Sequence, residues 1–354
     1  MFTLPIAKAR DFRIVVLEIE SGKIKAILLD KNDPKNSLPL YQTSVSLPIL
    51  FYDNEARHEQ EILNQVKKIS QKIKKDTGIT PEEVHCLLPT HLIEIENKII
   101  NSPYSLKKDN TEFSRELADK NTKKYLSNQK NKKLVDDIIL STDKKDNNFK
   151  IHHLITTAES SFIAKLTRNI AETLSPPSKI NLHSRPLAYF STLNKIGKTK
   201  EPLVILDPGG ETTDLLVIKD GKLHQLGWLP GGKNTLTRRI SESNNSSPHQ
   251  TYSELELLQN NNLHDKQAQL LKNLTDDFIR EWLFEIKEVI GEMKDRELAI
   301  LIDDDFSYYL STTINNWSDE PNIINIDRDW LGIDTISHKH LDTEIASIFA
   351  RSYL

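Results

Sequence analysis

The sequence has only one cysteine, Cys86, in 354 residues. A single thiol excludes an internal disulfide framework and a cysteine-based zinc site, and it suits a reducing compartment. No uninterrupted apolar run approaches the length that spans a bilayer, and residues 1–13 lack the apolar core of a signal peptide. We therefore expect a cytoplasmic protein, and any link to a membrane would go through a partner.

A surplus of basic residues is absent as well. The chain has 47 Lys and Arg residues against 51 Asp and Glu residues, which gives a formal net charge of −4. Without an overall basic field, nucleic acid is not an expected partner. Hydrophobic residues make up 37% of the chain, which is below the usual share but enough for real cores in one large domain or two to three small ones.

The most informative stretch is residues 203–218, in which two apolar runs flank the sequence Asp-Pro-Gly-Gly-Glu-Thr-Thr-Asp. Such runs, bounded by a glycine turn, predict two buried strands. At the turn, glycines allow the main chain to approach an anion, successive N–H groups and hydroxyls can bind phosphate, and carboxylates can hold Mg²⁺. An ordinary hairpin is the simpler alternative, but the order of these residues is more specific and favours a phosphate site.

Hydrophobic periodicity predicts further elements along the chain. A hairpin is expected over residues 11–30, a loop or sheet edge over 32–46, and a strand over 47–52. Helices are predicted over 54–77, 107–133, 158–174, 263–293 and 307–317, and strands over 84–88, 92–100, 134–141, 149–156, 298–302 and 321–326. His152 and His153 are neighbours on one predicted strand, so they should point to opposite faces and should not share a metal ion.

The segment Asp207–Asp214 resembles the second phosphate-binding hairpin of the actin-like ATPase superfamily, in the branch that holds FtsA and PilM. Residues 230–240, with Gly231 and Gly232, resemble the segment that opens the following helix in that branch. The resemblance extends from Phe12 to Leu354. It implies an α/β fold of the actin-like (ribonuclease H-like) type, with two lobes and an inserted small α+β subdomain.

The resemblance also implies a division of the chain. Residues 1–88 would form the first part of lobe I, 89–175 the inserted subdomain and 176–200 the return to lobe I. Residues 201–320 would form lobe II, and 321–354 would be closing elements of lobe I.

By the same resemblance, ATP would lie between the lobes. The residues implied to bind it are Glu18, Ser21, Asp207, Gly209, Gly210, Thr212, Thr213, Gly231 and Gly232, with Mg²⁺ at Asp207 and Asp214. Two loops depart from the pattern: Glu20 replaces a glycine in the first, and Asp303–Asp305 replace glycines in the adenosine loop. Extra carboxylates repel a triphosphate. A purely structural role therefore suits the first hairpin at least as well as phosphate binding does. ATP binding is expected to be weak or lost.

Three functions follow from the resemblance. The first is a PilM-like scaffold of a pilus, secretion or envelope machine, which would bind the cytoplasmic tail of an inner-membrane protein and would be able to self-associate. The second is an active FtsA-like cell-division ATPase, in which Glu211 or Asp214 would orient water. The third, a sugar kinase, lacks any sugar-site signature. No basic amphipathic tail follows the last predicted helix, which favours PilM, or the related GspL, over FtsA.

Overall fold

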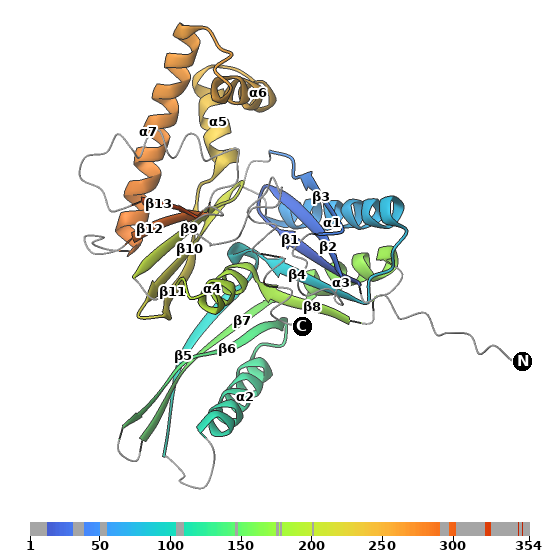
Figure 1. The fold of residues 1–354 in the computed structure, drawn as a ribbon, viewed down its shortest axis with the longest axis vertical. Helices are drawn as coiled ribbons and strands as arrows, with labels where there is room; N and C mark the ends of the chain where they lie inside the picture. The colour runs from blue at the N-terminus through green and yellow to red at the C-terminus, as the bar shows by residue number, and fades with distance from the viewer. Residues whose placement is uncertain are drawn as a thin grey trace, which may run out of the picture.

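The computed structural model describes residues 13–30, 39–49, 55–103, 110–145, 148–174, 177, 179–199, 202–290, 297–301, 323–326, 346 and 349. Within these residues, two five-stranded sheets form the centres of two lobes, and a three-stranded sheet forms a smaller subdomain (Figure 1). No helix in the described part of the chain is both long enough and apolar enough to cross a membrane.

The first lobe contains a sheet with the strand order β3-β2-β1-β4-β8. Its strands are β1 (Arg13–Ile19), β2 (Lys23–Asp30), β3 (Tyr41–Ser46), β4 (Glu83–Leu88) and β8 (Lys179–Ser184). β1 and β2 form an antiparallel hairpin, and β1, β4 and β8 run parallel. One face is covered by α1 (Glu55–Thr77) and α3 (Ser160–Leu174), and the other packs against Ala188, Ala346 and Phe349. The central strands are therefore apolar on both faces.

The second lobe repeats this arrangement in the order β11-β10-β9-β12-β13. Its strands are β9 (Leu203–Pro208), β10 (Thr212–Lys219), β11 (Lys222–Pro230), β12 (Glu297–Leu301) and β13 (Ile323–Ile326). Its helices, α5 (Lys233–Ser243), α6 (Pro248–Gln259) and α7 (Asp265–Ile290), contribute to the core on one face.

Helix α4 (Arg185–Lys195) lies between the two lobes. Leu187, Tyr189 and Leu193 pack against the second sheet, whereas Ala188 belongs to a cluster with Ile14 of the first sheet. Because α4 contacts both sheets, the residue at its start, Arg185, is placed where the two lobes meet.

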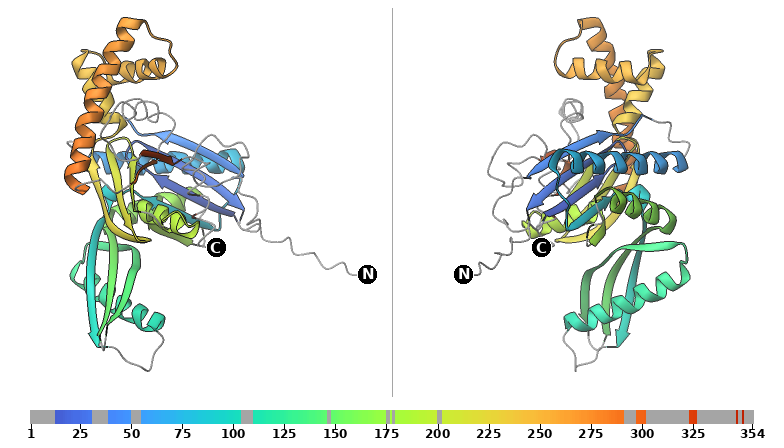
Figure 2. Two further views of the ribbon diagram at one scale, coloured as in Figure 1. Left: turned by 60° about the vertical axis from the view of Figure 1, so that its left-hand side comes forward. Right: turned by 90° about the vertical axis from the view of Figure 1, so that its right-hand side faces the viewer.

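The inserted subdomain consists of a sheet in the order β5-β7-β6 with α2 packed on it. Its elements are β5 (Glu94–Pro103), α2 (Asn110–Asn128), β6 (Lys132–Lys145) and β7 (Asn148–Glu159), and the short helix η1 (Thr90–Leu92) leads into it. Figures 1 and 2 show that the subdomain projects at the end of the molecule opposite α6 and α7. His153 is buried and hydrogen-bonded to Asp137 at 2.6 Å, while His152 is half-buried on the other face, as predicted.

Three expectations need correction or fall outside the described residues. The strand expected over 47–52 is wrong for its described residues, 47–49: the strand is β3, at 41–46, whose residues alternate in burial because it is an edge strand. The strand β13 pairs with β12 in the second sheet, so a boundary at 321 that returns the chain to lobe I is wrong for residues 323–326. Asp303–Asp305 and the helix expected over 307–317 lie outside the described residues.

Candidate functional site

The tips of two hairpins, one from each lobe, touch each other. A methyl group built on Gly22, at the β1–β2 turn, would lie only 2.6 Å from Cα of Gly210, at the β9–β10 turn. The two backbones are therefore in direct contact, and neither position has room for a side chain. This contact brings the predicted site residues of both hairpins together at the boundary between the lobes.

Ser21 binds the amides at the tip of the second hairpin. Its hydroxyl oxygen accepts hydrogen bonds from the backbone N–H groups of Glu211 at 2.9 Å and Thr212 at 3.1 Å. The N–H of Gly209 donates to the carbonyl of Thr212 at 2.9 Å, which closes the turn. The expected anion-binding amides thus make hydrogen bonds within the protein.

The N-terminus of α5 packs against the same tip. The N–H groups of Lys233 and Asn234 donate to the carbonyls of Gly209 (3.1 Å) and Gly210 (2.8 Å). A methyl group on Gly232 would collide with the Gly209 carbonyl, which explains the glycine there. A helix N-terminus is a general anion site, but here carbonyl oxygens of the hairpin occupy it.

The two threonines of the motif and Gly231 are also tied to the surrounding protein. The hydroxyl of Thr213 donates to the Gly231 carbonyl at 2.8 Å and accepts from Trp282 Nε1 at 3.2 Å. The hydroxyl of Thr212 lies 3.3 Å from Nδ1 of His91. Both hydroxyls therefore have partners within the protein.

Glu211 is one of the two residues expected to orient water, and both of its carboxylate oxygens accept hydrogen bonds from the protein. Arg238 donates to both of its carboxylate oxygens, at 2.8 and 2.6 Å, and Asn234 Nδ2 donates to one of them at 3.0 Å. A bidentate arginine pair of this kind is strong and directional. It fixes Glu211 against α5.

A buried guanidinium lies among the acidic residues of the two hairpins. Arg185, only 2% exposed, donates to Asp207 Oδ2, lies 3.6 Å from Asp214 Oδ2, and lies 3.7 Å from Glu20 Oε1. Its partners are those that the resemblance assigned to Mg²⁺, together with Glu20. We call Arg185, Asp207, Asp214 and Glu20 the interlobe cluster.

Glu18, beside the interlobe cluster, has a partner as well, and Glu20 has a second one. The hydroxyl of Tyr189 donates to Glu18, which is fully buried. Lys25 Nζ lies 2.9 Å from Glu20 Oε1, and both side chains are almost completely buried. Glu20, at the position where the resemblance implied a glycine, is therefore held by cations of this chain.

Burial and charge oppose each other in setting the pKa values of the interlobe cluster. Burial alone would raise the pKa of Glu20, but Lys25, Lys23 and Arg185 bring it well below its ordinary value. Burial alone would lower the pKa of Arg185, but Asp207, Tyr189 and Asp214 raise it well above the ordinary value. Burial raises the pKa of Asp214, although Arg185 and the Thr90 N–H oppose that rise. At neutral pH the guanidinium and Glu20 are therefore both charged.

Most of these partners were not identified from the sequence. Arg185, Tyr189 and Lys25 belong to no motif, and Asn234 and Arg238 lie in the segment 230–240 but were not expected to be site residues. Each acts here through its position in the tertiary structure. The one available signal was an arginine within an otherwise largely apolar helix start, Arg185-Pro-Leu-Ala-Tyr-Phe, where a buried charge calls for a partner.

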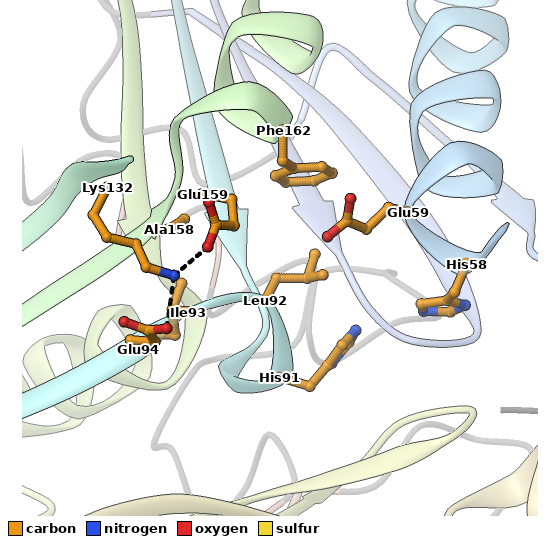
Figure 3. Close-up of a pocket in the computed structure, with 10 residues that line it drawn as sticks. All are labelled: His58, Glu59, His91, Leu92, Ile93, Glu94, Lys132, Ala158, Glu159 and Phe162. Atoms are coloured by element: carbon orange, nitrogen blue, oxygen red, sulfur yellow. Dashed lines mark hydrogen bonds and ion pairs between the residues drawn. The ribbon is translucent and has the colours of Figure 1, made fainter. Parts of the chain in front are cut away.

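A separate groove of about 210 Å³ lies between the first lobe and the inserted subdomain. Its lining residues come from α1, η1, β5, β6, β7 and α3 and are His58, Glu59, His91, Leu92, Ile93, Glu94, Lys132, Ala158, Glu159 and Phe162. Figure 3 shows Lys132 between Glu94 and Glu159 on one side, with His58 and His91 on the other. Lys132 Nζ lies 2.6 Å from Glu94 and also bonds Glu159.

His91 lines the groove and also contacts the second hairpin through Thr212. Burial, with help from the charges of His58 and Arg185, lowers the pKa of His91 from 6.5 to about 3. Burial and the neighbouring His183 lower the pKa of His85 to about 4. Both residues are therefore neutral in the folded protein at any pH above about 5.

These histidines predict a loss of stability in mild acid. Their folded-state pKa values are below the unfolded value of 6.5, so the unfolded chain binds more protons as the pH falls. The stabilisation that these neutral histidines provide is complete above pH 6.5. It declines as the pH falls toward their folded-state pKa values. We expect each histidine to remove about 2 kcal/mol of unfolding free energy between pH 6.5 and 5, measured by urea denaturation. His91→Asn should reduce this dependence by about half, because His85 remains, whereas the exposed His249→Asn should leave it unchanged.

The two similar sheets, the hairpin tips between them and the inserted subdomain define the class: the chain has the actin-like two-lobed fold. Among solved structures, it is similar to the PilM–PilN type IV pilus biogenesis complex, with a TM-score of 0.62, 13% identity, and coverage of 96% of this chain and 98% of that one. It is also similar to the ethanolamine utilization protein EutJ from Carboxydothermus hydrogenoformans, with a TM-score of 0.51, 11% identity, and coverage of 98% and 91%. At these identities the likeness shows the fold alone. No protein-family model matches the sequence, and no curated protein matches it.

Proposed function

We propose that this protein is a PilM-like scaffold of a type IV pilus, secretion or envelope assembly machine. It would act on the cytoplasmic face of the inner membrane by binding the cytoplasmic tail of a membrane partner. The observation that carries the proposal is the groove between the first lobe and the inserted subdomain. It is supported by a fold similar, over nearly the whole length of this chain, to a chain of the PilM–PilN type IV pilus biogenesis complex.

The composition of the groove indicates which tail would bind. Its wall carries three carboxylates, of Glu59, Glu94 and Glu159, against one ammonium group, of Lys132. Its apolar surface includes Leu92 and Phe162. Cytoplasmic segments next to membrane spans are rich in Lys and Arg, so a short tail with an apolar side chain beside a basic one complements this groove.

The proposal is tested with synthetic peptides that cover the cytoplasmic tails of pilus and secretion membrane proteins from the same organism. Fluorescence polarisation should find one that binds, and Glu94→Arg should weaken its binding by about tenfold or more, because the substitution places a cation opposite the basic tail. Glu94 is 56% exposed, so the fold should tolerate the change. Glu256→Arg, at an exposed position on α6, is the matched control. Equal binding by wild type and Glu94→Arg would exclude this groove as the binding site.

A further inference from the structure

We infer that this chain closes the cleft between its lobes with its own side chains and does not bind Mg²⁺–ATP: Arg185 takes the place of the metal ion, and the Ser21 hydroxyl takes the place of a phosphate oxygen. This inference concerns the hairpin tips and not the groove. It therefore stands or falls independently of the proposed function.

The first argument is the use of the hydrogen-bond donors. A phosphate held by this motif would need backbone N–H groups of the second hairpin or of the α5 N-terminus. Those of Glu211 and Thr212 already donate to Ser21, and those of Lys233 and Asn234 already donate to hairpin carbonyls. A nucleotide would have to break these buried hydrogen bonds before it could form its own.

The second argument is space. Phosphates in this arrangement would lie between the two hairpin tips, but the backbones of Gly22 and Gly210 are already in contact there. Ser21 Oγ lies so close to Gly209 that a methyl group on that glycine would be 2.7 Å from it. Binding a phosphate would therefore require the two lobes to move apart.

The third argument is charge. Asp207 and Asp214 would hold Mg²⁺ only if their carboxylates were available to it. Instead, both face the guanidinium of Arg185, which is permanently charged and nearly completely buried. Glu20 adds a further carboxylate at the same place, paired with Lys25. A metal ion would have to displace Arg185, and a triphosphate without the metal would meet the carboxylates directly.

The consequence is a lobe arrangement that needs no nucleotide. In a nucleotide-dependent protein, a ligand that binds one lobe angle better than another sets that angle. Here the interlobe cluster and the Ser21 hydrogen bonds join the two hairpins within the protein itself. The angle between the lobes is then a fixed property of the chain.

The decisive experiment is a nucleotide titration of the full-length wild-type protein. A ligand at about 100 times its Kd raises the melting temperature by several degrees, so about 5 mM Mg²⁺–ATP reports any site with a Kd of about 50 µM or tighter. We expect a shift of less than about 1 °C, and no saturable heat in isothermal titration calorimetry. A saturable signal in calorimetry, or a concentration-dependent melting shift, would overturn the inference.

A second measurement tests the role of Ser21 itself. Ser21→Ala removes the acceptor from two buried N–H groups, so its melting temperature should be lower than that of wild type by about 3 °C or more. Ser253→Ala removes an exposed hydroxyl from α6 and should melt like wild type. If Ser21→Ala also melted like wild type, its hydroxyl would not join the lobes and the inference would be wrong on this point.

Discussion

Replacing Arg185 with leucine is expected to lower the free energy of unfolding by about 3–5 kcal/mol, the usual cost of removing one partner from a buried ion pair. The substitution leaves the carboxylates of Asp207, Asp214 and Glu20 close together without the guanidinium that faces all three. The measurement is denaturant-induced unfolding followed by circular dichroism, with the midpoint of the main transition compared between variants.

The matched control for this prediction is an arginine on the surface. Arg239 pairs with Glu281, but their side chains are 50% and 64% exposed. An exposed pair contributes at most about 1 kcal/mol, so Arg239→Leu should change stability little. If both variants lost the same stability, the interlobe cluster would contribute no more than a surface pair.

The interlobe cluster also predicts a rescue. Adding Asp207→Asn to Arg185→Leu removes one of the stranded charges, so the double variant should be more stable than Arg185→Leu alone. A double variant whose loss equals the sum of both single losses would indicate that Arg185 and Asp207 are not coupled.

The substitution Gly210→Ala is expected to destabilise the protein by about 2–3 kcal/mol, near the upper end for overpacking. Its methyl group would collide with the backbone of Gly22, and a backbone atom cannot move aside as a flexible side chain can. Thermal and urea denaturation of the variant and wild type provide the measurement.

Gly227 offers the control for this effect. It lies in β11, and a methyl group built on it meets nothing within 4 Å. Gly227→Ala should therefore stay within about 0.5 kcal/mol of wild type. Similar losses in the two variants would mean that the cost comes from the loss of glycine itself and not from contact between the lobes.

The sequence by itself determined the elements whose apolar pattern is unambiguous. Both buried hairpins, the helix α1 and the long helix α7 follow from runs or stripes of apolar residues, because each of them packs on a core. The strand β3 was misplaced because its alternating polar residues face solvent at a sheet edge, where the hydrophobic signal is weak. The four-residue strand β13 was found but was assigned to the wrong lobe, since the edge of either sheet could accept so short a run.

The sequence showed two turns with polar residues, at Glu18–Ser21 and at Asp207–Asp214, and only the resemblance implied that they meet; the structure brings their tips into contact. Only the tertiary structure decided what that site contains. Arg185 faces the acidic residues because α4 packs between two sheets, and that packing depends on contacts with residues far away in the chain. The groove likewise depends on residues as distant as His58 and Glu159. A local pattern of apolar residues specifies a helix or a strand. What a charged side chain or a cavity can bind depends instead on the residues that folding places next to it.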